Sequence, residues 1–476
     1  MTELLVIGGE RVPAAEGKTL EVIEPSTGAP MAEVAEAGPE DADRAVGVAL
    51  RAFEEGPWPR TSARERGRVL TKASLLMRER LEELARLEAR NGGKPINAAR
   101  GEIDIVANVF EYWGGAANKI FGETVPIVPP GIDVTLREPV GVCVLITPWN
   151  FPLAITSWKV APALACGNTA IVKPASQTPL TALAMADILR EAGLPDGALS
   201  VLPGPGSTVA GALIADPRVS KISFTGSTEV GTHVMKEAAN NITRVSLELG
   251  GKSASVIFAD ADLDVCIEKS IWAVFDNAGQ DCCARSRAFV ERPIYDEFIE
   301  RFAKRAESIA LGEPLDEATE MGPLISNGQR QTSLDYIQLG IDEGARRVTG
   351  GDVLDSPGFY LRPAVLADVH NEMRVAREEI FGPVASIIPF DTEAEAIRLA
   401  NDTPYGLSGS VWTENLGRAI RVSKAIRAGV ISVNSSSSVF TEAPFGGYKQ
   451  SGIGREMGMH AAELYTELKN IFFSEA

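Results

Sequence analysis

The architecture of the chain is indicated first by Val140-Gly141-Val142-Cys143-Val144-Leu145-Ile146-Thr147, an uncharged run rich in β-branched residues. A run this short and apolar is typical of a strand buried in a parallel sheet. It lies within an uncharged segment, Pro139 to Trp158, that also contains Pro148, Asn150 and Pro152. Those residues would interrupt a membrane-spanning helix, so we interpret the segment as a buried strand followed by a loop, with no membrane association.

Predicted helices and strands alternate on both sides of this run. Residues 62–90 carry leucine and alanine at helical spacing, which predicts one long amphipathic helix. Strands are predicted at 169–173, 200–202 and 221–224, and a helix at 179–191. From Leu263 the alternation restarts, with helices at 263–277, 295–309, 393–401 and 416–425 and strands at 288–291, 384–390, 409–412 and 429–434. This order predicts an α/β fold with two doubly wound domains, the second beginning near Gly250.

Composition restricts the partners and the compartment. The 46 basic and 64 acidic residues give a net charge of −18, which repels nucleic-acid backbones and anionic membranes. Five cysteines are irregularly spaced and three histidines lie far apart, so neither a disulfide framework nor a metal site is predicted. The start, Met1-Thr2-Glu3-Leu4, lacks the basic region of a signal peptide, and we expect a cytoplasmic protein.

The residues that carry chemistry lie in four short motifs. Phe275-Asp276-Asn277-Ala278-Gly279-Gln280-Asp281-Cys282-Cys283-Ala284 presents a thiol beside small and amide residues. A carboxylate, Glu248, lies upstream of it in Leu247-Glu248-Leu249-Gly250-Gly251-Lys252. A thiol nucleophile with a carboxylate base is suited to covalent chemistry at a carbonyl carbon. The other motifs are Pro148-Trp149-Asn150-Phe151-Pro152 and Pro444-Phe445-Gly446-Gly447-Tyr448-Lys449.

Together these motifs resemble the aldehyde dehydrogenase superfamily, from about Glu24 to about Leu468. The resemblance implies oxidation of an aldehyde to a carboxylic acid with a nicotinamide cofactor, and a homodimer or homotetramer. It also implies a Rossmann-like dinucleotide-binding domain, a catalytic domain and a small β oligomerisation arm. We assign these to 1–119 with 139–249, to 250–440, and to 120–138 with 457–476, respectively.

By resemblance to the family pattern G-Q-x-C, Cys282 is the nucleophile and Cys283 is its neighbour. The side-chain amide of Asn150 and the backbone N–H of Cys282 are expected to stabilise the oxyanion that forms. Glu248 is expected to activate the water that hydrolyses the thioester, because its apolar surroundings would raise its pKa. Lys159 and Glu456 are implied as a pair through which the proton leaves.

The cofactor is expected at a turn that follows the strand 221–224. Glycine at a strand-to-helix turn lets backbone N–H groups approach a pyrophosphate. Glu379 and Phe381 match the family's E-x-F-G-P, which implies contacts with the nicotinamide ribose and ring. The full set of predicted cofactor residues is Ile146, Thr147, Pro148, Trp149, Lys173, Ser176, Gly206, Phe224, Gly226, Ser227, Leu249, Gly250, Glu379 and Phe381.

Ser176 bears on the choice between the two nicotinamide cofactors. NAD-specific members often carry a glutamate three residues after the strand-end lysine, here Lys173, and that charge repels a 2′-phosphate. A lysine and a hydroxyl can both bind a phosphate. The sequence therefore predicts that NADP is accepted as well as NAD.

The aldehyde channel is predicted to be lined by Asp281, Phe151, Trp158, Tyr112, Val439 and Phe445, with Glu442 as a further candidate. An acid at position 281 favours a cationic aldehyde, such as an aminoaldehyde or betaine aldehyde, or a broad range of aldehydes. Arg285 leaves succinic semialdehyde open as an alternative, because a guanidinium attracts a carboxylate. Two other classes are also considered. A coenzyme-A-acylating dehydrogenase typically lacks the glutamate base, so the presence of Glu248 argues against that class. A non-enzymatic structural protein would tolerate loss of the nucleophile, whereas Cys282, Asn150 and Glu248 are all present in this sequence.

Overall fold

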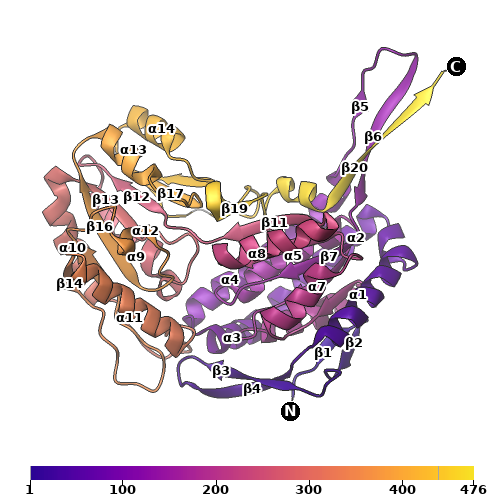
Figure 1. The fold of residues 1–476 in the computed structure, drawn as a ribbon, viewed down its shortest axis with the longest axis horizontal. Coiled ribbons are helices and arrows are strands. Elements are labelled where there is room, and N and C mark those ends of the chain that lie inside the picture. The colour runs from indigo at the N-terminus through magenta and orange to yellow at the C-terminus, as the bar shows by residue number, and fades with distance from the viewer. Residues whose placement is uncertain (1, 438, 476) are drawn as a thin grey trace.

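The computed structural model describes residues 2–437 and 439–475, which form two large sheets, each covered by helices, and a small antiparallel sheet (Figure 1). This mixed α/β architecture confirms the fold class predicted from the sequence. Short strands β3 (Thr19–Glu24) and β4 (Ala29–Ala35) form an additional hairpin near the amino terminus.

The first sheet has eight strands in the order β19-β11-β10-β7-β8-β9-β1-β2. Their bounds are Gly452–Ile453, Arg244–Leu249, Lys221–Gly226, Val142–Ile146, Thr169–Lys173, Leu199–Val201, Leu5–Ile7 and Glu10–Val12, in that order. The five central strands pair in parallel, and the outer strands pair antiparallel. The chain runs outward from β7 to β9 and returns to β10 beside β7, so a switch point lies between β7 and β10. In doubly wound sheets, ligands bind at the carboxyl ends of the strands at such a point.

Helices cover both faces of this sheet because β7 is apolar at every position. Val144 packs in one core cluster with α1, α7 and α8, and Leu145 packs in the other with α2 to α6. The helices span Pro39–Glu54 (α1), Ala63–Glu79 (α2), Leu81–Gly92 (α3), Ile96–Ala116 (α4), Pro152–Ala165 (α5), Leu180–Ala192 (α6), Gly211–Ala215 (α7) and Thr228–Ala238 (α8).

The second sheet has seven strands in the order β14-β15-β16-β13-β12-β17-β18, parallel except for β14. These strands span Arg346–Thr349, Ala364–Ala367, Val384–Phe390, Arg287–Glu291, Ala254–Ile257, Ser408–Trp412 and Val430–Val433, in that order. Its helices are α9 (Leu263–Phe275), α10 (Tyr295–Glu307), α11 (Asn327–Asp342), α12 (Arg374–Arg377), α13 (Glu393–Asn401) and α14 (Leu416–Ala425).

The third sheet is an arm that projects away from both large sheets and carries the carboxyl terminus (Figure 1). It contains β5 (Thr124–Val125), β6 (Gly131–Pro139) and β20 (Thr466–Ser474), paired antiparallel in the order β20-β6-β5. Leu468, Phe472 and Phe473 of β20 are 60%, 44% and 56% exposed.

Short 3₁₀ segments occur at Trp58–Arg60, Ala117–Lys119, Ala239–Asn241, Asp276–Gly279, Arg292–Ile294, Lys449–Ser451 and Met459–Leu464, and a short π-helix at Gly206–Ala210. Among the described residues, no helix combines the length and the apolar character that crossing a membrane requires. The predicted single helix at 62–90 is wrong: Arg80, with φ −102° and ψ 18°, separates α2 from α3.

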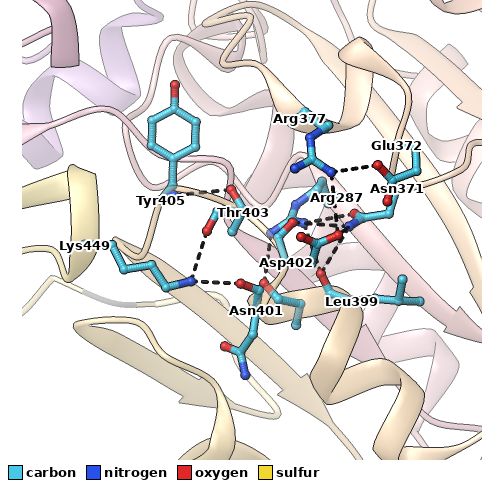
Figure 2. Close-up of polar contacts among 11 residues, drawn as sticks. Arg287, Asn371, Glu372, Arg377, Leu399, Asn401, Asp402, Thr403, Tyr405 and Lys449 are labelled. Atoms are coloured by element: carbon cyan, nitrogen blue, oxygen red, sulfur yellow. Dashed lines mark hydrogen bonds and ion pairs between the residues drawn. The ribbon is translucent and has the colours of Figure 1, made fainter.

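The segment 447–451 connects the second sheet to the first. Lys449 donates from Nζ to the carbonyl oxygens of Asn401 and Thr403 at 2.9 and 3.1 Å, as Figure 2 shows. Ser451 Oγ donates to the carbonyl oxygen of Gly250 at 2.7 Å, immediately after β11. Beside Lys449, a partly buried polar network fixes the loop after α13; it contains Arg287, Asn371, Leu399 and Asp402 (Figure 2). These bonds hold the end of β11 against the second sheet.

Candidate functional site

Two cavities meet at Cys282. The first, which we call the cleft, has a volume of about 230 Å³ and lies at the carboxyl ends of β7, β10 and β11. The second, which we call the tunnel, has a volume of about 340 Å³ and lies beside α4 and α5. Among the residues that the structure describes, Cys282 is the one that lines both cavities. A sulfur at this junction can therefore contact a ligand in either cavity.

The loop that carries Cys282 has an unusual backbone. After α9 ends at Phe275, Asn277 and Ala278 adopt left-handed conformations with φ of 49° and 57°. Gly279 follows with φ 72°, and a Cβ there would meet the carbonyl oxygen of Gly382 at 2.2 Å. The loop is fixed by Gln280, which donates from Nε2 to the Asn277 carbonyl and accepts from the Ile325 N–H, both at 2.9 Å. Cys282 is thus presented on a rigid turn.

The surroundings of the two central groups, Cys282 and Glu248, raise the pKa of both and so favour their uncharged forms. A hydrogen bond with Cys283, together with burial, raises the pKa of the Cys282 thiol well above its ordinary value, and the carboxyl groups of Asp281 and Glu248 add to the rise. Burial also raises the pKa of Glu248, with a further contribution from Glu456. Neither carboxyl oxygen of Glu248 has a hydrogen-bond partner among the described residues. This carboxyl is free to receive a proton from a ligand or a water molecule.

Asn150 lies on the turn between β7 and α5 and is 4% exposed. Its Nδ2 donates to the carbonyl oxygen of Gln280 at 3.0 Å, two residues before Cys282. The backbone carbonyl oxygen of Asn150 accepts a hydrogen bond from Asn277 Nδ2 at 2.9 Å. The side-chain amide of Asn150 therefore lies beside the Cys282 loop.

The predicted cofactor residues fall into three groups. Those that line the cleft are Pro148, Trp149, Gly226, Ser227, Leu249, Gly250, Glu379 and Phe381. Ile146, Thr147 and Phe224 are buried at or just beyond the strand ends beneath the cleft. Lys173, Ser176 and Gly206 lie outside its lining, at or after the carboxyl ends of β8 and β9.

Glu379 and Phe381 enter the cleft from the second sheet. Glu379 accepts the Gly251 N–H at 3.0 Å, and burial raises the pKa of this carboxyl to about 7. The ring of Phe381 contacts Trp149 edge-on, with centroids 5.2 Å apart. Gln329 was not predicted from the sequence; it lines the cleft and donates from Nε2 to the backbone carbonyl oxygens of Ile380 and Phe381. Thr225 also lines the cleft and was not predicted as a cofactor residue, although it is part of the predicted turn.

Five of the six predicted channel residues line the tunnel, namely Asp281, Phe151, Trp158, Val439 and Phe445. Trp158 and Phe445 are in edge-on contact, with centroids 5.5 Å apart. Tyr112 lies outside the tunnel lining and packs against Trp113. The tunnel also has three charged residues that were not predicted, Lys94, Glu102 and Asp276.

Neither Arg285 nor Glu442 lines the tunnel. The Arg285 side chain is buried, donates to the Cys283 carbonyl oxygen at 2.8 Å and to Ser410 Oγ at 3.2 Å, and is thereby turned away from the tunnel. Glu442 is exposed.

Lys159 and Glu456 form a buried ion pair. Ser223 Oγ bridges them, at 2.9 Å from Lys159 Nζ and 3.1 Å from Glu456 Oε1. Glu456 raises the pKa of Glu248 and Lys159 lowers it, which places the pair within electrostatic reach of that carboxyl.

The chain is similar to known proteins over nearly its whole length. The model of the aldehyde dehydrogenase family matches residues 12–471. Betaine aldehyde dehydrogenase of Bacillus subtilis is 43% identical over 477 residues, covering 99% of this chain and 97% of that protein. The solved NAD⁺ complex of an aldehyde dehydrogenase from Bacillus cereus is 42% identical and superposes with a TM-score of 0.99, covering 100% of this chain and 97% of that one. Betaine aldehyde dehydrogenase from Staphylococcus aureus, solved with NAD⁺, is 40% identical with a TM-score of 0.97, covering 99% and 94%. A family match over nearly the whole chain and relatives above 40% identity show that this protein belongs to the aldehyde dehydrogenase family of enzymes.

Proposed function

We propose that this enzyme oxidises an aldehyde to a carboxylic acid with NAD⁺ or NADP⁺, through intermediates bound to Cys282. The observation that carries the proposal is the position of Cys282 at the junction of the cleft and the tunnel. An aldehyde in the tunnel and a dinucleotide in the cleft would approach the same sulfur atom.

The cleft fits a dinucleotide. It is lined by Gly226 and Ser227 at the start of α8, where free backbone N–H groups favour a phosphate. A Cβ on Gly250 would come within 1.9 Å of Glu379 Oε2. The absence of a side chain at Gly250 therefore allows the Glu379 carboxylate to lie close to the backbone in the wall of the cleft. Burial lowers the pKa of Lys173, at the end of β8, to about 8. When bound, a nicotinamide ring supplies a hydride acceptor and a positive charge that stabilises a nearby thiolate.

Addition of the Cys282 sulfur to the carbonyl carbon creates a thiohemiacetal oxyanion. Asn150 Nδ2 has two hydrogens, and one is already held by the Gln280 carbonyl oxygen. The other is available to the oxyanion, together with the Cys282 backbone N–H. A preorganised pair of donors of this kind stabilises charge as it develops.

Loss of hydride from the adduct leaves a thioester on Cys282, which water must hydrolyse. Glu248 is the base that we assign to this water, because it lines the cleft with Cys282 and its oxygens have no partner among the described residues. Its raised pKa brings the carboxyl closer to the pH at which a general base works best. Lys159 and Glu456 would then pass the proton onward.

For the substrate, we propose a cationic or apolar aldehyde. The tunnel presents the aromatic rings of Phe151, Trp158 and Phe445 and the carboxyl group of Asp281. Aromatic faces and carboxylates both favour ammonium groups. Lys94, the one lysine among the described residues of the tunnel lining, is paired with Glu102, and Arg285 is turned away. A carboxylated aldehyde such as succinic semialdehyde would therefore find no free cation among the described lining residues.

We expect kcat/KM for betaine aldehyde or a short aminoaldehyde to exceed that for succinic semialdehyde by about tenfold or more, because cation–π attraction and the tunnel acids both favour the cation. Initial rates of cofactor reduction across an aldehyde panel, with and without coenzyme A, measure this ratio. Asp281→Asn should reduce the preference while changing the rate for a neutral aliphatic aldehyde less. A clear preference for succinic semialdehyde would contradict the assignment, and a requirement for coenzyme A would indicate an acylating enzyme.

We expect measurable turnover with NADP⁺ as well as NAD⁺, since position 176 carries a hydroxyl and not a carboxylate. Ser176 Oγ donates to the Gly204 carbonyl oxygen at 2.9 Å, so its side chain lies at the carboxyl edge of the sheet. Ser176→Glu should lower kcat/KM for NADP⁺ by about tenfold or more through charge repulsion, with a smaller change for NAD⁺. Activity of the unmodified enzyme with NAD⁺ and none with NADP⁺ would refute the prediction.

We propose further that the enzyme is a cytoplasmic homodimer or homotetramer. The exposed apolar residues of β20 on the arm support association with another copy. All five cysteines are free thiols, which suits a reducing compartment.

A further inference from the structure

The steps assigned above leave unused a buried cluster of three ionisable groups near Asn150. Lys94 precedes α4, Glu102 lies on α4 and Glu88 lies on α3; they are 2%, 5% and 0% exposed. Lys94 and Glu102 form an ion pair. Removing three ionisable groups from water is costly, so they require strong local partners.

Those partners lie on the turn between β7 and α5 and in the first turn of α5. Lys94 Nζ donates to the carbonyl oxygen of Asn150 at 3.1 Å. Glu88 Oε1 accepts the N–H of Leu153 at 3.2 Å, and Glu102 Oε1 accepts the N–H of Ala154 at 3.4 Å. The cluster therefore contacts both the residue that bears the amide and the helix that follows it.

These bonds replace an ordinary helix cap. The first N–H groups of an α-helix have no partner within the helix. The N-cap residue of α5 is Phe151, which has no side-chain hydrogen bond, and Pro152 follows it. Glu88 and Glu102, from two other helices, accept the N–H groups that a polar cap would satisfy. The start of α5 is thereby tied to α3 and α4.

The turn is also held from the side of the second sheet. Asn277 Nδ2 donates to the Asn150 carbonyl oxygen at 2.9 Å, so that oxygen accepts from Asn277 and Lys94 together. Because the backbone of Asn150 is held in this way, its side-chain amide can move only by rotation about the side-chain bonds. The hydrogen bond from Nδ2 to the Gln280 carbonyl oxygen restricts that rotation.

We propose that Lys94, Glu102 and Glu88 are positioning residues that fix the Asn150 amide where the oxyanion develops. This inference rests on the oxyanion role proposed for Asn150. The donors of an oxyanion site act through preorganisation, so a small displacement of the turn slows the step in which charge develops. The cluster is not itself expected to touch the reacting atoms.

The test is a double-mutant cycle between Glu102→Gln and Asn150→Ala. Glutamine keeps the size of the side chain and an oxygen for the Ala154 N–H but removes the charge that pairs with Lys94. The measured quantity is the single-turnover rate of nicotinamide reduction at saturating cofactor and aldehyde. Because misplacement by about 1 Å can cost about a hundredfold, we expect Glu102→Gln to slow this rate by about ten- to a hundredfold. In the Asn150→Ala background the same change should slow it by less than about twofold, since coupled residues are non-additive.

Arg100→Met is the matched control. Arg100 lies on the same helix, but its guanidinium pairs with Glu82 and Glu317 and is 30% exposed. We expect a change below about twofold in both backgrounds, because exposed pairs contribute little. Thermal unfolding of each variant checks folding. If Glu102→Gln does not fold, Lys94→Met enters the same cycle, since it removes the donor to Asn150 directly.

Equal losses in the two backgrounds, or no loss in Glu102→Gln, would overturn the positioning role while leaving the proposed reaction intact. A single-turnover rate unchanged by Asn150→Ala would instead refute the oxyanion role, and this inference would fall with it. A merely structural role would lower the unfolding temperature without coupling the two sites.

Discussion

Replacing Cys282 by serine is expected to abolish aldehyde oxidation, with a loss of roughly a thousandfold or more in kcat, because removing a covalent nucleophile removes the reaction path itself. A serine hydroxyl is a poor nucleophile at its ordinary pKa and needs an adjacent base to become reactive, whereas a thiol ionises far more readily. Steady-state cofactor reduction measures the loss, and dinucleotide binding, followed by fluorescence or thermal shift, should persist.

Two matched variants make this result specific. Cys266→Ser changes a buried thiol on α9 that lies outside both cavities, and it should retain activity within about threefold, as expected for a substitution distant from the reacting atoms. Cys283→Ser tests the neighbouring thiol, whose hydrogen bond is the largest cause of the raised pKa of Cys282. If Cys283→Ser eliminated turnover and Cys282→Ser did not, the nucleophile would be Cys283.

Glu248→Gln should separate the two halves of the reaction. Oxidation of the adduct does not need the base that we assign to hydrolysis, so one equivalent of reduced cofactor should still form rapidly. The steady state should then slow by about a hundredfold or more, within the range of general-base contributions. Stopped-flow absorbance resolves the burst from the steady state. Loss of the burst itself would mean that Glu248 acts before hydride transfer.

The same assignment fixes the sign of the pH dependence. The base must be deprotonated to accept a proton, and burial raises the pKa of Glu248 above its ordinary value. Steady-state turnover should therefore rise with pH through that raised pKa and fall as the carboxyl becomes protonated at lower pH. In the Glu248→Gln variant, the rate of thioester hydrolysis should no longer show this rise with pH.

Much of the architecture could be predicted from local patterns. The predicted elements at 384–390, 393–401 and 416–425 coincide with β16, α13 and α14, because buried strands and amphipathic helices leave clear periodicities. The break at Arg80 has no proline or glycine to mark it. Helix α4 was missed because a charged residue, Glu102, occupies a buried position and obscures its apolar face.

The site was predictable only where short motifs carried it. Cys282, Asn150 and Glu379 lie in recognisable motifs, and the structure brings them to one cleft. Lys94 and Glu102 lie in none. Their pairing depends on how α4 packs against the turn after β7, and this packing cannot be predicted from the spacing of residues along the chain. Gln329 was missed for the same reason.

The cleft and the tunnel have only Cys282 in common among their described lining residues, and this has an evolutionary consequence. Under the proposed assignment of the tunnel to the aldehyde and of the cleft to the dinucleotide, substitutions in the wall of the tunnel can alter which aldehydes are accepted while the contacts of the dinucleotide are kept. Selection can thus diversify substrate choice within such a scaffold without rebuilding its redox machinery at each change.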